Sequence, residues 1–137
     1  MRVFFDTNVL VSAFATRGLC ADLFRVVLGE HQLLIGEVVL AELRRVLRER
    51  VKLPRTMIRE IEELLREHTV IPRPRRHLNV GLADKDDEWI IASAVSGNAD
   101  VLVTGDVELL EAGDRAPVTI TNPRGFWETL RATPPTK

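Results

Sequence analysis

The stretch RVFFDTNVLVSAF, residues 2–14, sets a carboxylate between two apolar runs. The residues before Asp6 are typical of a short buried strand, and the strand is expected to end at this aspartate. An unpaired carboxylate is unfavourable in an apolar environment, so Asp6 needs a partner. Two explanations are open at this point. Asp6 could cap a helix that starts near Thr7, or it could belong to a charged site at the end of the strand.

Short apolar runs alternate with helical periods along the rest of the chain, which is typical of an α/β fold around a mainly parallel sheet. The stretch RPRRHLNVGLADKDD is polar and rich in turn residues, and we expect it to be a loop. Gly29 and Gly97 are expected to stop helices, and Asn122 to cap the last one. The expected strands are residues 2–6, 32–36, 69–72 and 117–121, together with a strand in residues 99–106 that runs into a turn before Asp106. The expected helices are residues 20–31, 37–51, 54–68, 87–97, 107–113 and 122–130.

The length and composition are those of one globular domain. The chain has 137 residues, of which 45% are hydrophobic and 28% charged. We expect residues 1–131 to form the domain and residues 132–137 a disordered tail. No apolar run approaches the roughly 20 residues of a membrane span, and the N-terminus does not resemble a signal peptide. Cys20 is the single cysteine, which suits a reducing compartment, so a cytoplasmic protein is expected.

The net charge of −1 conceals an uneven distribution. The segment from Arg44 to Arg76 holds eleven Lys and Arg residues against five Glu, whereas acids outnumber bases in the rest of the chain. Such a basic middle could form a cationic rim beside an anionic centre. It could equally be the solvated face of two amphipathic helices, and the sequence leaves both readings open.

Asp6 and Asp106 each follow an expected strand. In a parallel α/β sheet, ligands bind beyond the carboxyl ends of the strands, so both acids should project from one edge of the sheet. Glu42 lies in the middle of an expected helix, and Asp87 opens another within the acid-rich group that contains Asp84. Each acid also has a structural explanation. Glu42 could be solvated, and the aspartates could cap helices.

Four converging carboxylates would repel one another unless cations were bound. Oxygen ligands alone suit Mg²⁺ or Mn²⁺, and such ions can activate a water and neutralise a phosphodiester during its hydrolysis. Thr7, Asn8 and Thr104 are short polar neighbours that could hydrogen-bond the carboxylates. The three histidines lack the spacing of metal ligands, and surface positions are expected for them: His31, His68 and His77.

Four segments resemble the PIN-domain family, in the branch of toxin components of toxin–antitoxin systems. They are VFFDTNVLVSAF, VVLAELRRVL, ADKDDEWIIASAVSGNADVLVTGD and ITNPRGFWETL, and they occur in the family's order over nearly the whole chain. The resemblance implies a three-layer α/β/α sandwich with about five strands and a ribonuclease that uses one or two Mg²⁺ or Mn²⁺ ions. It also implies an RNA substrate, a cognate antitoxin and a homodimer.

Residue by residue, the resemblance implies catalytic and metal-binding roles for Asp6, Glu42, Asp87 and Asp106. Asp84 falls at a position that is often acidic in this branch, so it is a fifth candidate ligand. The resemblance also implies that three polar residues line the site: Thr7, Asn8 and Thr104. Glu37 competes with Glu42 for the helical position, although its place at the start of a helix suits a dipole role.

Other functional hypotheses remain possible besides metal-dependent RNA cleavage. In the nuclease hypothesis, basic residues bind the RNA backbone, and the candidates are Arg44, Arg45, Arg48 and Lys52. A non-catalytic module could instead bind protein or RNA through the same basic segment. A phosphatase with Asp6 as nucleophile is a weaker alternative, because haloacid-dehalogenase-like phosphatases place a second acid where this chain has Asn8.

Overall fold

A computed structural model describes residues 1–76 and 79–132. Five strands form one sheet in the order β3-β2-β1-β4-β5, and every neighbouring pair is parallel. This confirms the predicted α/β fold with a parallel sheet of five strands. The strands are β1 (Arg2–Phe5), β2 (Gln32–Gly36), β3 (Thr69–Ile71), β4 (Val101–Val103) and β5 (Thr119–Thr121).

Within the described residues, seven α-helices connect and flank the strands. Six correspond to the expected helices, with ends that differ by one or two residues, whereas the helix over residues 7–15 was expected only in the interpretation that Asp6 caps a helix. The fifth helix begins at Lys85 instead of Asp87, because Asp84 caps it by accepting a hydrogen bond from the Asp86 N–H at 2.9 Å. The helices are α1 (Thr7–Ala15), α2 (Leu19–Glu30), α3 (Glu37–Glu49), α4 (Arg55–Arg66), α5 (Lys85–Ser96), α6 (Val107–Glu111) and α7 (Pro123–Ala132).

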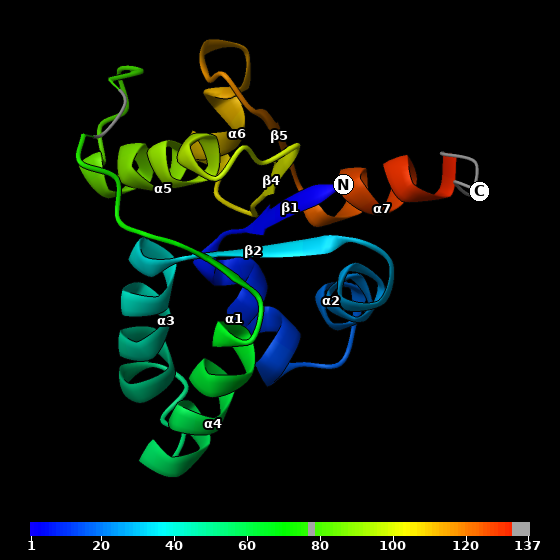
Figure 1. The fold of residues 1–137 in the computed structure, drawn as a ribbon, viewed down its shortest axis with the longest axis vertical. Coiled ribbons are helices and arrows are strands. Elements are labelled where there is room, and N and C mark those ends of the chain that lie inside the picture. The colour runs from blue at the N-terminus through cyan, green and yellow to red at the C-terminus, as the bar shows by residue number, and fades with distance from the viewer. Residues whose placement is uncertain (77–78, 133–137) are drawn as a thin grey trace.

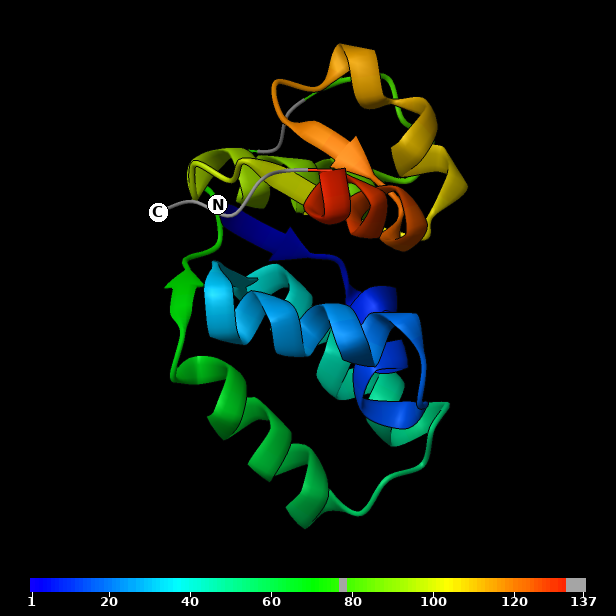
Figure 2. The same cartoon turned by 90° about the vertical axis from the view of Figure 1, so that its right-hand side faces the viewer.

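The helices form layers on the two faces of the sheet (Figures 1 and 2). Helices α2 and α7 pack side by side on one face, and α5 contacts β2 and β4 from the other. Helix α1 packs against both α2 and α3, and the α3–α4 hairpin extends beyond the sheet (Figure 1). Ala132 is the last residue of α7, while His77 and residues 133–137, which include most of the expected tail, lie outside the described residues.

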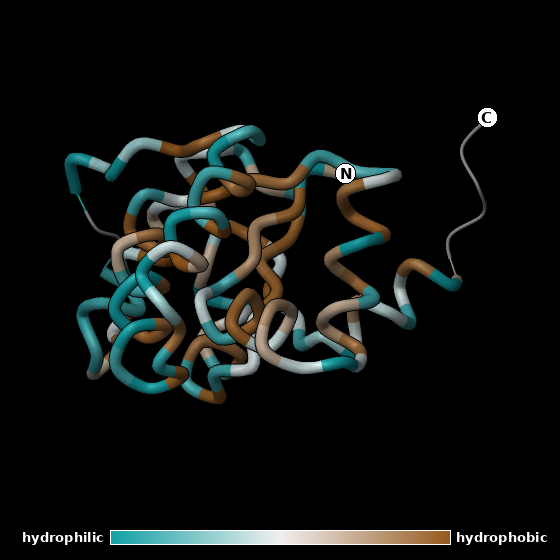
Figure 3. Tube along the Cα trace, turned by 90° about the horizontal axis from the view of Figure 1, so that it is seen from below, coloured by the Kyte–Doolittle hydropathy of each residue, from teal (hydrophilic) through white to brown (hydrophobic). Residues whose placement is uncertain are grey.

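Strand β1 is the centre of the core. Val3, Phe4 and Phe5 have no exposed surface, and Phe4 pairs in register with Leu34 on one side and Leu102 on the other. A strand buried on both faces reads as a continuous apolar run, which is the pattern that precedes Asp6. The tube coloured by hydropathy shows the same arrangement, with hydrophobic segments inside and hydrophilic segments around them (Figure 3).

Gly36, the last residue of β2, allows α5 to approach the sheet closely. A Cβ atom at this position would lie 2.6 Å from Ser93 Oγ on α5 and 2.8 Å from the Phe4 ring. Both contacts are shorter than van der Waals separation, so a larger residue would push α5 away from the sheet. No helix within the described part of the chain is long and apolar enough to cross a membrane.

Candidate functional site

The segments that follow β1 and β4 bring Asp6 and Asp106 to the same edge of the sheet. Thr104 joins them, because its Oγ1 donates a hydrogen bond to Asp6 Oδ2 at 2.7 Å and accepts one from the Asp106 N–H at 3.0 Å. Asn8 Oδ1 accepts a hydrogen bond from the Gly105 N–H at 3.3 Å. The parallel pairing of β1 with β4 therefore sets two acids and two polar side chains around one point.

Three of the candidate aspartates also cap helices. Asp6 Oδ1 accepts from the Thr7 N–H at 2.7 Å, Asp106 Oδ1 accepts from the Glu108 N–H at 2.8 Å, and Asp84 caps α5. The capping explanation therefore holds for each of them. It does not exclude a site, because the three helix N-termini offer partial positive charge that favours carboxylates near them.

Asp6 is 6% exposed, and burial, followed by the charge of Asp106, raises its pKa despite hydrogen bonds from Thr104 and Thr7. Glu42, on α3, is half-buried. Burial and then the charge of Asp6 raise the pKa of Glu42 as well. The buried Thr7 hydroxyl has no hydrogen-bond partner among the described residues. It lies close to Glu42, and this proximity partly offsets the rise in the pKa of Glu42.

Asp87, on α5, shows the largest effect. Burial and the charges of Asp106, Asp84 and Asp6 raise its pKa to about 7. A carboxylate raises the pKa of another only at short range, and the charge of Asp6 acts on both Glu42 and Asp87. Asp106 acts on Asp6 and Asp87, and Asp84 acts on Asp87, so the five acids proposed from the sequence lie around Asp6, with Glu42 on one side and the three others on the other: Asp6, Glu42, Asp84, Asp87 and Asp106.

The donor chemistry of this acidic cluster fits a hard divalent cation. Its ligands are carboxylate oxygens, and a cation would remove the repulsion that raises their pKa values. Within residues 1–76 and 79–132, no three Asp, Glu, His or Cys side chains are arranged so that they could hold a metal ion as they stand. Binding of an ion would therefore require side chains to rotate, which is open to the half-buried Glu42 and Asp87 but is opposed at Asp6 by its two hydrogen bonds.

Glu88 is a buried acid whose role the sequence analysis missed. Its Oε2 accepts hydrogen bonds from the N–H groups of Val80 at 2.8 Å and Gly81 at 3.2 Å, and Lys85 Nζ lies 3.1 Å from Oε1. Burial alone would raise the pKa of Glu88, but Lys85 and the backbone N–H groups outweigh it and lower the pKa. Glu88 thereby fixes the segment before α5.

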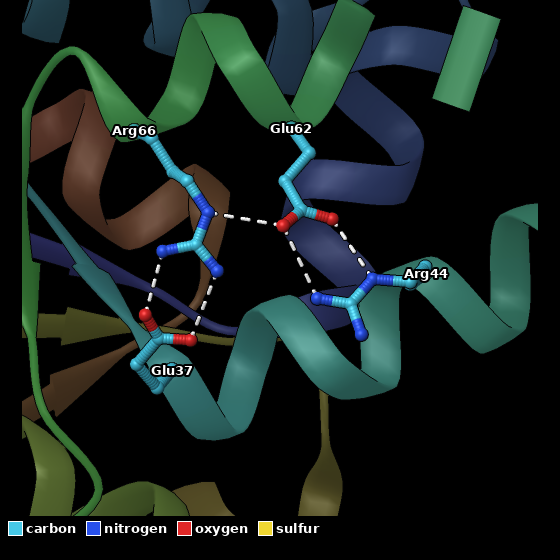
Figure 4. Close-up of polar contacts among 4 residues, drawn as sticks. All are labelled: Glu37, Arg44, Glu62 and Arg66. Carbon is cyan, nitrogen blue, oxygen red and sulfur yellow. Dashed lines mark hydrogen bonds and ion pairs between the residues drawn. The ribbon is translucent and has the colours of Figure 1, made fainter. Parts of the chain in front are cut away.

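Glu37 lies in a different environment from Glu42. It forms two hydrogen bonds with Arg66 of α4, at 2.6 and 3.1 Å, and Arg66 also pairs with Glu62 at 3.0 Å (Figure 4). Glu62 in turn accepts two hydrogen bonds from Arg44, at 2.8 and 3.2 Å. This network joins α3 to α4. The Glu37 carboxylate is therefore paired with Arg66 in the α3–α4 hairpin. By contrast, burial and the charges of Asp6 and Asp86 raise the pKa of Glu42.

The four basic candidates separate into two groups. Arg44 and Arg48 line a groove of about 630 Å³ between α3 and α4, and Lys52 is exposed in the segment that joins these helices. Arg45 lies beside the acidic cluster, in a smaller groove that Glu42 also lines. Of the four, Arg45 is the one that shares a groove with a member of the acidic cluster.

The fold and the site define an α/β domain with an acidic centre at the carboxyl edge of its parallel sheet. The chain belongs to the PIN domain family, whose sequence profile matches residues 2–108. No curated protein sequence matches the chain.

Solved structures share the fold over most of the chain. VapBC-1 from nontypeable Haemophilus influenzae is 22% identical with a TM-score of 0.64, and the match covers 90% of this chain and 99% of that one. PAE2754 from Pyrobaculum aerophilum is 20% identical with a TM-score of 0.65, covering 97% and 91%. VapBC2 from Rickettsia felis, bound to a DNA fragment from its promoter, is 17% identical with a TM-score of 0.63, covering 89% and 98%.

Proposed function

We propose that this protein is a metal-dependent endoribonuclease that hydrolyses RNA phosphodiester bonds. The observation that carries the proposal is the acidic cluster, in which Asp6, Glu42 and Asp87 all have raised pKa values at the carboxyl edge of the sheet. Membership of the PIN domain family supports the same conclusion. A nuclease needs cations near a polyanionic substrate, and a group of mutually repelling carboxylates provides their ligands.

In this proposal, Asp6, Glu42, Asp87 and Asp106 hold one or two Mg²⁺ or Mn²⁺ ions, with Asp84 as an additional ligand. When bound, such an ion supplies a Lewis acid that lowers the pKa of a water and neutralises charge on the phosphodiester. The chain's own residues orient the ligands. Thr104 fixes Asp6 through its hydroxyl, and Asn8 secures the segment between Thr104 and Asp106 through Gly105. Arg45 lies where it can pair with a phosphate of the substrate.

We further propose that the protein is the toxin component of a toxin–antitoxin pair and acts in the cytoplasm as a homodimer. The similarity to the structures of VapBC-1 and VapBC2 supports a cognate protein partner. The surface of α4 supports self-association. Its apolar stripe is only partly buried, because Met57 and Leu64 are 45% and 38% exposed while Ile58 and Leu65 lie in the core.

The proposal is tested with a mixed pool of structured and single-stranded RNAs. Wild type, Asp87→Asn and Asp114→Asn are each incubated with EDTA, Mg²⁺ or Mn²⁺. Asp114 is an exposed acid outside the cluster and controls for the loss of one charge. We expect cleavage by wild type and Asp114→Asn with either metal, none in EDTA, and at least a hundredfold loss in Asp87→Asn.

Two outcomes contradict the nuclease proposal. Cleavage that persists in EDTA excludes a metal-dependent reaction at these acids. Absence of cleavage by wild type with both metals favours the alternative of a non-catalytic binding module. That alternative has one observation in its favour, namely that the carboxylates are not arranged to hold an ion as they stand.

A further inference from the structure

A groove of about 230 Å³ lies directly beside the acidic cluster. It is formed by α3, the start of α5 and the segment that follows β3, and Glu42 of the acidic cluster belongs to its lining. The other charged or aromatic lining residues are Arg45, Arg73, Asp86 and Trp89. A ligand in this groove would therefore be in contact with the candidate metal site.

Arg73 and Trp89 form an ordered pair in the groove. The guanidinium carbon of Arg73 lies 4.4 Å from the centroid of the Trp89 ring, within the range of a cation–π contact. Trp89 is half-buried against the core, whereas Arg73 is exposed. The Trp89 ring thus holds the Arg73 guanidinium in place, and the exposure of Arg73 leaves it accessible to a ligand.

Neither arginine of the groove is held in a short ion pair with a described residue, although Glu42 and Asp86 line the same groove and Glu42 lies within range of the Arg45 charge. Among the described residues, no ion pair involves Arg73, and Arg45 reaches Glu49 only at 3.8 Å between exposed side chains. An exposed ion pair of this kind contributes little to the stability of the protein, so Arg45 can exchange Glu49 for another anion. By contrast, Arg44 and Arg66 in the neighbouring groove are held by Glu62 and Glu37. Among the described residues, Arg45 and Arg73 are therefore two cations of this groove whose guanidinium groups can contact an anion without breaking a short ion pair.

We infer that Arg73, stacked on Trp89, and Arg45 form a nucleotide-binding subsite next to the acidic cluster. A base of single-stranded RNA stacks on the guanidinium plane of Arg73, and Arg45 pairs with the adjoining phosphate. The inference rests on the proposed RNA substrate. It identifies unpaired nucleotides as the form of RNA that the site accepts, because a paired base could not be splayed onto Arg73.

The test separates stacking from charge. Binding of a labelled single-stranded oligoribonucleotide is measured by fluorescence anisotropy in EDTA, for wild type, Arg73→Ala and Arg73→Lys. Lysine keeps the charge but lacks the planar guanidinium. We expect both variants to bind about tenfold more weakly. Arg131→Ala, which removes an exposed arginine near the end of α7, should bind like wild type.

A second readout reports on Trp89 itself. The chain has two tryptophans, so Trp127→Phe leaves Trp89 as the single indole fluorophore. Addition of the oligoribonucleotide should change its emission in this background. The change should be lost when Arg73→Ala is added, although the variant should remain folded because Arg73 is exposed.

Each result decides a separate point. Unchanged binding by Arg73→Ala and Arg73→Lys overturns the subsite, and metal-dependent cleavage by the same wild-type preparation would then leave the proposed function intact. Full affinity in Arg73→Lys with loss in Arg73→Ala overturns the stacking geometry. If wild type neither binds nor cleaves RNA, the subsite and the proposed function both fail.

Discussion

At the scale of single residues, Asp6 is a buried carboxylate that is hydrogen-bonded through both oxygens and also lies near another acid. Its two oxygens accept hydrogen bonds from the Thr7 N–H and the Thr104 hydroxyl, which partly compensate its burial. Burial and the nearby charge of Asp106 nevertheless raise its pKa. A carboxylate held firmly in a repulsive environment lowers the stability of the free protein, and this is typical of functional sites.

The clearest consequence concerns Asp87, whose pKa is raised from 3.8 to about 7. The folded state then binds a proton more tightly than the unfolded chain, so stability present at low pH is lost as the pH rises toward 7. In EDTA, we expect Asp87→Asn to be more stable than wild type at pH 8 by about 1–2 kcal/mol, a value reduced for the partial exposure of the side chain. At pH 4 the two proteins should differ little.

Urea unfolding at both pH values measures this difference, with Asp114→Asn as the matched loss of an exposed acid. A variant that is equally or less stable than wild type at pH 8 would contradict the electrostatic account of the acidic cluster.

Thr104 is the residue that connects the two strand-end acids. Thr104→Val removes its hydroxyl at nearly constant volume and leaves Asp6 Oδ2 and the Asp106 N–H without this partner. We expect a loss of about 1–3 kcal/mol in the free energy of unfolding. Thr104→Ser, which keeps the hydroxyl, should retain most of the stability, and equal losses in both variants would show that the methyl group matters more than the hydrogen bonds.

The sequence predicted the residues of the acidic cluster better than their environment. Asp6 and Asp106 were identifiable because each follows a strand of a parallel sheet, and Glu42 and Asp87 because the PIN resemblance marks them. Glu88 and the Arg73–Trp89 pair were not predicted. Their contacts depend on how the segment between β3 and α5 folds back, and no local periodicity encodes that path.

At the scale of the elements, the contact of α5 with the sheet determines where Asp87 lies. Gly36→Ala would put a methyl group 2.6 Å from Ser93 Oγ and 2.8 Å from the Phe4 ring. We expect a loss of about 1–3 kcal/mol in the free energy of unfolding, because the buried neighbours cannot move without disturbing the core.

Gly29→Ala in α2 is the matched control, since a Cβ there meets no atom within 4 Å. It should leave stability unchanged or raise it by up to about 1 kcal/mol, as alanine favours the helix. Thermal unfolding followed by circular dichroism compares the two variants. If Gly36→Ala is as stable as Gly29→Ala, α5 does not require the close approach.

The ends of the helices were predicted less accurately than the helices themselves. The strands and six of the helices within the described residues follow from apolar periodicity, and α2 ends one residue after Gly29, close to the expected end. Helix α1 did not follow from periodicity and was expected only as a helix that Asp6 could cap. The start of α5 was placed too late, since any of several aspartates could serve as its cap. The choice of Asp84 depends on the hydrogen bond to the Asp86 N–H.

At the scale of the whole molecule, the exposed part of the α4 stripe predicts self-association. Sedimentation velocity at micromolar concentration should give about twice the 15.4 kDa mass of the chain. Met57→Glu combined with Leu64→Lys places charges on the exposed side chains and should shift the protein to a monomer without unfolding it. A wild-type monomer would contradict the proposed homodimer and leave the acidic cluster unaffected.

The most direct test of the central claim is calorimetric titration of Mn²⁺ into wild type, Asp6→Asn and Asp114→Asn. We expect saturable binding of one or two ions to wild type and Asp114→Asn. Binding should be at least tenfold weaker in Asp6→Asn, because the charge of that carboxylate acts on Glu42 and Asp87 in the acidic cluster. Equal affinity in all three proteins would show that the acids at the sheet edge are not the metal site.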